Sequence, residues 1–431
     1  MNELQGQLSE AFAFRKSKEY NRALEIYESL WEQNSDQFND WAGWSYAWCL
    51  KETQQYEKAL DICRKLYLKY NGFTMLMQLY ANCIYYTQFN TKEIPPLHIL
   101  KKAIEAMCKL YPAHLPYSLT ARAIFKYIKI SLSETNIDWD DAENWLLKLD
   151  PDLLETTSFK MMGPKGKMIE FASPLEEWYS LMIKIKAGKN ESQSLLDLLE
   201  TTKKLNLKWH YNNQIWFARK EAFAYIQLGQ KTKGENILRK IISQKNDWFL
   251  FNDLADIVSD KQEAIKLYCK AALAFGEIEK KVKLYSKLYQ LFKMECLDKE
   301  AKLHLILIAA IRNKEGWAIP IDLERDMNAY QINDLSSYKI KELLKELDLI
   351  WKSKSDYDKQ KYEGVIEKIL EGNSSGFIKT KEGNKYYFSN KEALALKNKF
   401  HVGTKVIFEL ANGFDKKKQV ATKNAIRLQI I

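Results

Sequence analysis

Apolar residues recur at helical spacing along most of the chain, up to about residue 350. Two N-terminal stretches, SKEYNRALEIYESLWEQN and TQQYEKALDICRKLYLKY, each place a tyrosine, then Ala-Leu three residues later, then further apolar residues at helical intervals. This period predicts amphipathic helices that each bury one face. Only eight prolines occur in the whole chain, so few residues would interrupt a succession of helices.

The two stretches are also copies of one another. Tyr20 and Tyr56 are 36 residues apart, as are Ala23 and Ala59. This pattern resembles the tetratricopeptide repeat (TPR), a helix–turn–helix unit with a period of about 34 residues. The resemblance implies stacked helix pairs with a shared core and a curved surface that grips a protein partner.

The repeat is clearest at the N-terminus and weakens further along. Ala264 and Ala301 mark fainter copies, 37 residues apart, whereas residues 90–210 lose the period and are interpreted as irregular helical repeats. Trp41, Trp44 and Trp48 fall on one face of an expected helix. Aromatic stripes at this spacing usually belong to a core, so we expect them to pack between helices.

A different pattern begins at Gly364. The runs GVIEKILEGNSSGFIK, EGNKYYFSN and GTKVIFELANGFDKKKQVATKNAI are short, rich in β-type residues and broken by Gly, Asn and Ser, which predicts a compact antiparallel barrel. Their order and spacing resemble the cold-shock domain, a five-stranded barrel of the OB type. The residues that carry the resemblance are Gly364/Ile366, Gly376/Phe377/Ile378, Tyr386/Tyr387/Phe388, Gly403/Val406/Phe408/Glu409 and Gln419/Ala421/Asn424/Ala425.

This resemblance implies a sheet face on which aromatic side chains stack on the bases of single-stranded nucleic acid. Phe377 and Tyr387 stand at aromatic positions of the family, but Lys368, Ser375 and Ser389 replace other aromatic or His residues. Stacking is worth about 1–3 kcal/mol per base, so the losses predict weaker binding than is usual for the family. The expected nucleic-acid-binding residues are Lys368, Phe377, Lys379, Tyr387, Lys416, Lys417 and Lys418, with the lysines contacting phosphates.

Between the two patterns lies a transition. Pro320 ends a helical stretch, and an amphipathic helix follows that places Ile340, Leu347 and Trp351 on one side. The next charged stretch, KSKSDYDKQK, has the composition of a linker. It would let the barrel move, or alternatively the Trp351 helix docks on the barrel and fixes it.

The sequence therefore predicts a mostly α-helical protein with a small all-β barrel. The expected parts are a TPR-like solenoid over residues 1–350, a charged linker over 351–361 and a cold-shock-like OB barrel over 362–431.

Net charge separates the same parts. Residues 361–431 contain fourteen Lys and Arg against seven Asp and Glu, a net charge of +7 out of +10 for the whole chain. A positive charge concentrated in one small domain is typical of a polyanion binder. The alternative is a solvated, lysine-rich surface, since Lys outnumbers Arg throughout the chain.

Catalytic and metal-binding motifs are not found. No HExxH, GxSxG, P-loop or Rossmann glycine pattern occurs, and the six cysteines are scattered without a CxxC pair. The loop Gly163-Pro-Lys-Gly-Lys is interpreted as a basic loop, Asp140 and Asp141 as a helix N-terminus, and His304 as a buried or boundary residue. We expect no enzyme activity, cofactor or metal, and a reducing cytoplasmic location for a chain with no signal peptide and no spanning segment.

Four functions fit these features. The first is a non-enzymatic adaptor that binds a protein through its helices and RNA or single-stranded DNA through its barrel. The second is a pure protein scaffold whose barrel has lost nucleic-acid binding. The third is a regulatory component of a bacterial phage-defence or conflict system, by analogy only. An enzyme hidden in residues 90–210 is the fourth, without a motif to support it.

Overall fold

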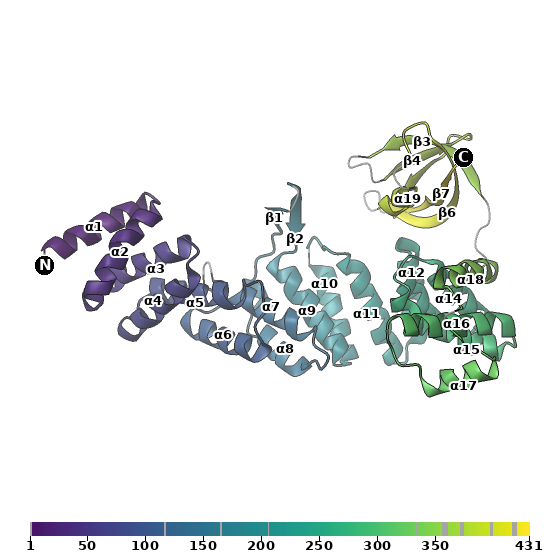
Figure 1. Cartoon of the computed structure of the whole chain (residues 1–431), viewed down its shortest axis with the longest axis horizontal. Helices are drawn as coiled ribbons and strands as arrows, with labels where there is room; N and C mark the ends of the chain where they lie inside the picture. Colours follow the sequence, from purple (N-terminus) through teal and green to yellow (C-terminus); the bar gives the residue numbers. More distant parts are fainter. Residues whose placement is uncertain are drawn as a thin grey trace. The chain divides into compact units, whose positions relative to one another are not determined.

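The structure is a computed structural model in which residues 2–115, 118–163, 166–205, 207–332, 334–335, 337–355, 361–370, 375–396, 400–415 and 420–431 are described. The chain divides into two compact units, Met1–Gln214 and Ile215–Ile431. Figure 1 colours the elements from the purple N-terminus to the yellow C-terminus. No helix in the described part of the chain is both long and apolar enough to cross a membrane.

The first unit is built mainly from antiparallel helix pairs. Consecutive helices pack on one another along the series, as the repeat predicts. The helices are α1 (Asn2–Lys16), α2 (Tyr20–Asn34), α3 (Asp40–Glu52), α4 (Tyr56–Lys69), α5 (Thr74–Gln88), α6 (Leu97–Leu110), α7 (Thr120–Ser131), α8 (Trp139–Leu146), α9 (Pro174–Gly188) and α10 (Ser192–Lys204). Single 3₁₀ turns occupy Ser35–Gln37 and Pro151–Leu153.

Small residues allow close packing where the repeat places them. Ala23 on α2 and Ala59 on α4 are fully buried. At Gly43 on α3, a Cβ would lie 2.5 Å from Leu66 Cδ2 on α4, so any larger residue would displace the Leu66 side chain. Asn39 caps α3, its side chain accepting the Ala42 N–H at 2.8 Å. The TPR-like arrangement of helices is therefore confirmed.

The tryptophan stripe of α3 packs only in part. Trp44 is buried and Trp48 packs against the core, with 5.3 Å between their ring centroids. Trp41 contacts Trp44 and Phe73 but remains 52% exposed. It stands at the first turn of the helix, where fewer neighbours surround a side chain.

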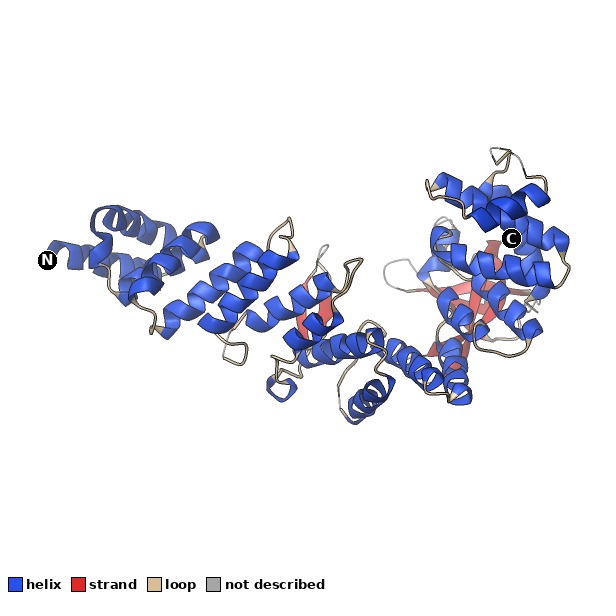
Figure 2. Ribbon diagram, turned by 90° about the horizontal axis from the view of Figure 1, so that it is seen from below, coloured by secondary structure: helices blue, strands red, loops and turns tan. Residues whose placement is uncertain are grey.

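One segment of the first unit is not helical. Strands β1 (Phe159–Met162) and β2 (Met168–Phe171) form an antiparallel hairpin with Phe159 opposite Phe171. The hairpin is separate from the barrel, and both appear as red ribbons in Figure 2. Its apolar side chains are exposed, among them Met161, Met162 and Met168. The expectation of irregular helical repeats over 90–210 did not include these two strands, which stand on either side of the predicted basic loop.

The second unit begins with another helical series around its own core. Its helices are α11 (Asn213–Gln227), which spans the boundary, α12 (Lys231–Gln244), α13 (Trp248–Ala255), α14 (Lys261–Leu273), α15 (Val282–Met294), α16 (Asp298–Lys314), α17 (Ile321–Ala329) and α18 (Ile340–Lys354). A 3₁₀ turn occupies Glu279–Lys281.

Helix α18 seals this second helical core. Trp351 is buried, stacks on Tyr285 with ring centroids 5.7 Å apart, and donates its Nε1–H to His304 Nε2 at 2.9 Å. His304 is fully buried, as expected, and its Nδ1 donates to the Glu300 carbonyl at 2.7 Å. The apolar side of the Trp351 helix, with Leu343, Leu347 and Trp351, therefore packs in the core of the helical series.

The remaining strands close into a barrel in the order β3-β4-β5-β7-β6. The elements are β3 (Tyr362–Ile369), β4 (Gly376–Thr380), β5 (Lys385–Phe388), α19 (Asn390–Ala395), β6 (Lys405–Asp415) and β7 (Val420–Ile430). β5 and β7 pair in parallel, the other pairs antiparallel. A five-stranded barrel with this crossover is consistent with an OB-type fold. Ile366, Ile378, Phe388 and Phe408 fill its core. The predicted fold class, a helical solenoid plus a small β-barrel, is confirmed.

Candidate nucleic-acid interface

Four outward-facing residues form a row across four strands of the barrel. Strand register places Lys368 of β3 opposite Phe377 of β4, Phe377 opposite Tyr387 of β5, and Tyr387 opposite Asn424 of β7. Their neighbours along the chain, Ile378, Phe388 and Ala425, are buried. Because side chains alternate across a strand, the row faces away from the core.

Phe377 and Tyr387 are the aromatic part of this row. Their ring centroids lie 5.7 Å apart and the ring planes meet at 63°. Both side chains are half-buried, so each leaves part of its ring accessible. Adjacent strands lie about 4.8 Å apart, which brings two aromatic surfaces within reach of neighbouring bases of one single strand.

The lysines of this face differ in their electrostatic surroundings. Lys368 is exposed and forms no ion pair with any residue that the structure describes. Lys379 lies 3.8 Å from the Glu367 carboxylate, which Lys385 contacts at 2.8 Å. The hydrogen bond from Lys385, with the charges of both lysines, lowers the pKa of Glu367. Glu367 thus offsets part of the charge that Lys379 was expected to offer a phosphate.

The predicted run Lys416, Lys417 and Lys418 lies outside the described residues. It connects β6 to β7, the connection between the fourth and fifth strands of the barrel. OB-type barrels bind oligonucleotides on the face of their second and third strands and through the loops beside it, including this one. The positions of Phe377, Tyr387 and this loop in the chain match that scheme.

The sequence interpretation did not include α19, although a signal was present. Ser389 and Glu392 have the Ser-x-x-Glu spacing of a helix start. In the structure Ser389 stands just before α19, so the position that the family gives to His belongs to a helix start. Glu392 turns to β7 instead of capping its own helix, and its Oε2 accepts the Arg427 N–H at 2.6 Å.

Glu392 and Arg427 fix the shape of β7. Arg427 has a positive φ of 53°, a backbone conformation that costs energy for a residue with a Cβ. Its Nη1 contacts Glu409 at 3.1 Å, while Glu392 is buried and also accepts the Leu428 N–H. The contacts of Glu392 join residues 35 and 36 positions apart and that of Glu409 residues 18 apart, so no local sequence pattern predicts them.

A second polar cluster lies in the first unit and was also missed. The fully buried Glu176 carboxylate accepts the His210 N–H and lies 2.6 Å from His210 Nδ1, and Asn213 Nδ2 donates to it at 2.8 Å. His210 Nε2 lies 3.6 Å from Glu170 Oε1 of β2. Hydrogen bonds from Lys208 and Ser158 lower the pKa of Glu170 to about 2. The cluster anchors the base of the hairpin to α9.

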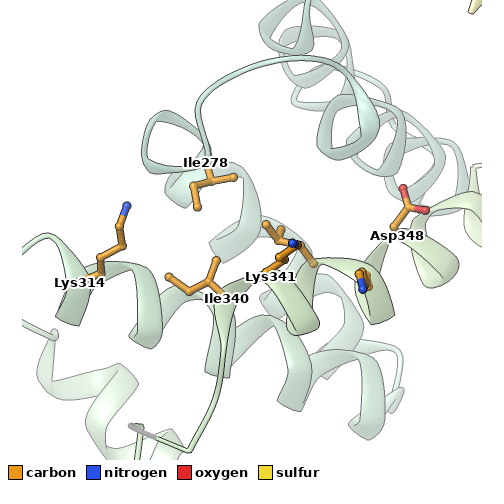
Figure 3. A pocket seen from close by; sticks show the side chains of 7 residues that line it. Ile278, Lys314, Ile340, Lys341 and Asp348 are labelled. Atoms are coloured by element: carbon orange, nitrogen blue, oxygen red, sulfur yellow. The ribbon is translucent and has the colours of Figure 1, made fainter. Parts of the chain in front are cut away.

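No His, Cys, Asp and Glu cluster with the size of a metal site occurs within the described part of the chain. A hollow of about 550 Å³ does occur on the second helical series, lined by Ile278, Lys314, Ile340, Lys341, Leu344, Lys345 and Asp348. Figure 3 shows Ile278 and Ile340 between Lys314 and Lys341. Lys314 forms ion pairs with Glu279 and Glu315, and Asp348 forms one with Lys352.

Comparison with known proteins covers mainly the helices. The family model "Domain of unknown function (DUF7017)" matches residues 215–348, which lie within the second helical series. No curated protein matches the chain.

Solved structures similar to this chain are helical repeat proteins. A TPR protein from Parabacteroides merdae is 12% identical over 66% of this chain and 98% of its own, with a TM-score of 0.28. Human IFIT1, in a dimer with PPP-AAAA, is 13% identical over 78% of this chain and 77% of its own, with a TM-score of 0.36. A TPR protein of Thermus thermophilus is 12% identical over 66% and 97%, with a TM-score of 0.19. At these TM-scores the similarities carry no argument about function.

Proposed function

We propose that this protein is a non-enzymatic adaptor whose cold-shock-like barrel binds single-stranded RNA or DNA while its helical repeats bind a protein partner. The observation that supports this most is the outward row of Lys368, Phe377 and Tyr387 across adjacent strands. It joins two stacking surfaces to an unneutralised cation, the two elements that single-strand binding requires.

The charge of the barrel supports the same proposal. Its described acidic residues are largely engaged within the domain, Glu367 by Lys385, Glu409 by Arg427 and Glu392 by backbone N–H groups. Lys368 and Lys423 are exposed and have no acidic partner among the described residues. Counterion release on phosphate binding then contributes a favourable, salt-dependent term.

For the helical repeats we propose protein recognition. Stacked helix pairs present extended surfaces that suit a peptide or a folded partner. The six cysteines are free thiols, which fits a reducing compartment, and we place the protein in the cytoplasm. The division that the sequence placed at residues 1–350, 351–361 and 362–431 is kept as part of the proposal, with α18 (Ile340–Lys354) counted among the helices.

The test is a fluorescence-anisotropy titration of the full chain with single-stranded RNA, single-stranded DNA and duplex DNA at two salt concentrations. We expect single strands to bind more tightly than the duplex. Phe377→Ala or Tyr387→Ala should lower single-strand affinity by roughly 1–3 kcal/mol and leave the salt slope nearly unchanged. Val365→Ala is the matched control, since Val365 is exposed but supplies no ring to stack on a base.

A protein scaffold without nucleic-acid binding is the second candidate, favoured by Ser375 and Ser389 in place of aromatic or His residues. Under that function all three variants would bind nucleic acid as weakly as the parent does. Loss of a captured protein partner on Tyr387→Ala, with no change in anisotropy, would decide for the scaffold. As a scaffold, the chain would fit a regulatory role in a bacterial phage-defence or conflict system.

A further inference from the structure

A crevice with a cavity volume of about 690 Å³ lies within the second unit. Its walls come from the barrel elements α19, β6 and β7 on one side and from helices α12, α13 and α14 on the other. Strand β6 contacts α12. Across the crevice, Lys391 Nζ of α19 lies 4.6 Å from the ring centroid of Phe275 in the segment after α14.

The aromatic row of the barrel leads directly into this crevice. Asn424 lines it and is the register partner of Tyr387. The step from Tyr387 to β7 is one strand spacing, about 4.8 Å. A single strand stacked on Phe377 and Tyr387 would therefore continue toward the crevice past Tyr387.

The crevice contains more positive charge than its own acidic residues offset. Lys270, Lys391 and Lys423 line it and form no ion pair with any residue that the structure describes. The two acidic lining residues are already engaged, Asp247 by Lys245 at 2.6 Å and Glu392 by the Arg427 N–H.

The surroundings of Lys391 add a second electrostatic indication. Partial burial, and to a smaller degree the positive charge of Arg427, lower the pKa of Lys391. A cation held near another cation gains from any anion that enters the space between them. Phe275 is 73% exposed, so its ring is accessible to a base beside the lysines.

We propose that this crevice holds the sugar–phosphate backbone of the single strand whose bases stack on Phe377 and Tyr387, so that helix α14 and Phe275 form part of the nucleic-acid site. This inference rests on the proposed function and extends it from the barrel to the helical series. It predicts a longer footprint than the two stacking residues need, because the strand continues past Tyr387 between the lysines. The four-strand row alone would hold only a few nucleotides.

The test compares oligonucleotides of two lengths, about 4 and about 12 nucleotides, within the range of OB-fold site sizes. The double variant Lys270→Gln/Lys423→Gln in the full chain should lower affinity for the longer strand and reduce its salt slope by up to about 1.4, from about 0.7 per lost phosphate contact. Phe275→Ala should weaken the longer strand roughly 5- to 150-fold. Binding of the short strand should stay within about twofold for both variants.

The matched control is Lys341→Gln/Lys345→Gln, which removes the same charge from exposed lysines on α18 of the same unit. If the crevice variants behave like this control while Tyr387→Ala still weakens both strand lengths, the crevice inference is overturned and the barrel function stands. Equal weakening of short and long strands by the crevice variants would also overturn the extended path. If Tyr387→Ala has no effect on either length, the proposed barrel function fails and the crevice inference fails with it.

Discussion

The second helical series and the barrel use aromatic side chains in opposite ways. Among the helices, Trp351 is buried with its ring stacked on Tyr285 and its N–H bound to His304. On the barrel, Phe377 and Tyr387 contact one another but face outward beside Lys368. An aromatic residue whose polar atom and ring faces are all engaged contributes to folding, whereas one with an accessible face is available to a ligand.

Charge follows the same division. Lysines on the helices commonly reach carboxylates of the next repeat, for example Lys287 to Asp256 and Lys293 to Asp326. In the barrel, Lys368 and Lys423 form no ion pair with the residues that the structure describes. Substitution of these paired helix lysines should therefore change stability, whereas substitution of the unpaired Lys368 should change binding.

The largest expected effect is on Trp351. Trp351→Ala should lower the free energy of unfolding by about 3–5 kcal/mol, because it leaves a cavity beside Tyr285 and an unpaired His304 Nε2. Urea unfolding followed by helical circular dichroism measures this. Trp317→Ala, at a 43% exposed tryptophan, is the control and should cost less than about 1 kcal/mol. If both substitutions lowered the free energy of unfolding equally, burial of Trp351 would not be what makes it important for stability.

The free energy of unfolding should fall at acid pH because His304 is buried in its neutral form. Burial lowers the pKa of His304 to about 4 from an ordinary 6.5. The unfolded chain therefore binds more protons between these two values, and stability falls as pH falls through that window, by up to about 3 kcal/mol.

His304→Gln is the matched variant for that titration. A glutamine oxygen can still accept the Trp351 N–H but has no proton to gain over this range. Unfolding free energies measured at intervals from pH 7 to pH 4 should fall more steeply for the parent chain than for the variant. Parallel curves would show that His304 does not contribute to acid sensitivity.

Tighter binding of single-stranded nucleic acid is expected when a third aromatic residue is added to the outward row at position 368. Lys368→Trp places an indole opposite Phe377, where the cold-shock pattern has tryptophan, and should raise affinity for single strands by roughly 1–3 kcal/mol. Lys368→Gln removes the charge without adding a ring and should weaken binding slightly. If tryptophan also weakened binding by the amount that glutamine does, Phe377 and Tyr387 would not lie on the path of the bases.

The smallest effect is expected from the lysine run between β6 and β7. Replacing Lys416, Lys417 and Lys418 by glutamine should weaken binding to every nucleic acid and flatten the dependence of log affinity on log salt by up to about 0.7 per lost single-strand contact. Titrations at four salt concentrations measure the slope. A change in sequence preference with an unchanged slope would contradict a role in phosphate contact.

The sequence predicted those parts of the fold that depend on local periodicity. Ala23, Ala59 and the helical spacing around them indicated packed repeats, and the short β-type runs around Ile378 and Phe388, broken by Gly, Asn and Ser, indicated strands. The hairpin of β1 and β2 gave no such signal, because Met161, Met162 and Met168 are exposed and show no alternation toward a core.

Only those residues of the candidate site that align with the cold-shock pattern could be predicted from the sequence. That pattern located Phe377 and Tyr387, and the strand register brings them together. The contacts of Glu392 with Arg427, of Glu176 with His210 and of Lys391 with Phe275 join residues distant in sequence. Such pairings depend on how elements pack, which a single sequence does not encode in any local period.

The exposed hairpin of the first unit has a chemical consequence for the purified protein. The Met161, Met162 and Met168 side chains are each more than half exposed, and an accessible thioether is readily oxidised to the sulfoxide. Each oxygen added turns an apolar side chain polar and raises the mass of the peptide that contains it. The rate at which peroxide oxidises these methionines therefore reports whether another molecule covers the hairpin: a bound partner would slow the oxidation.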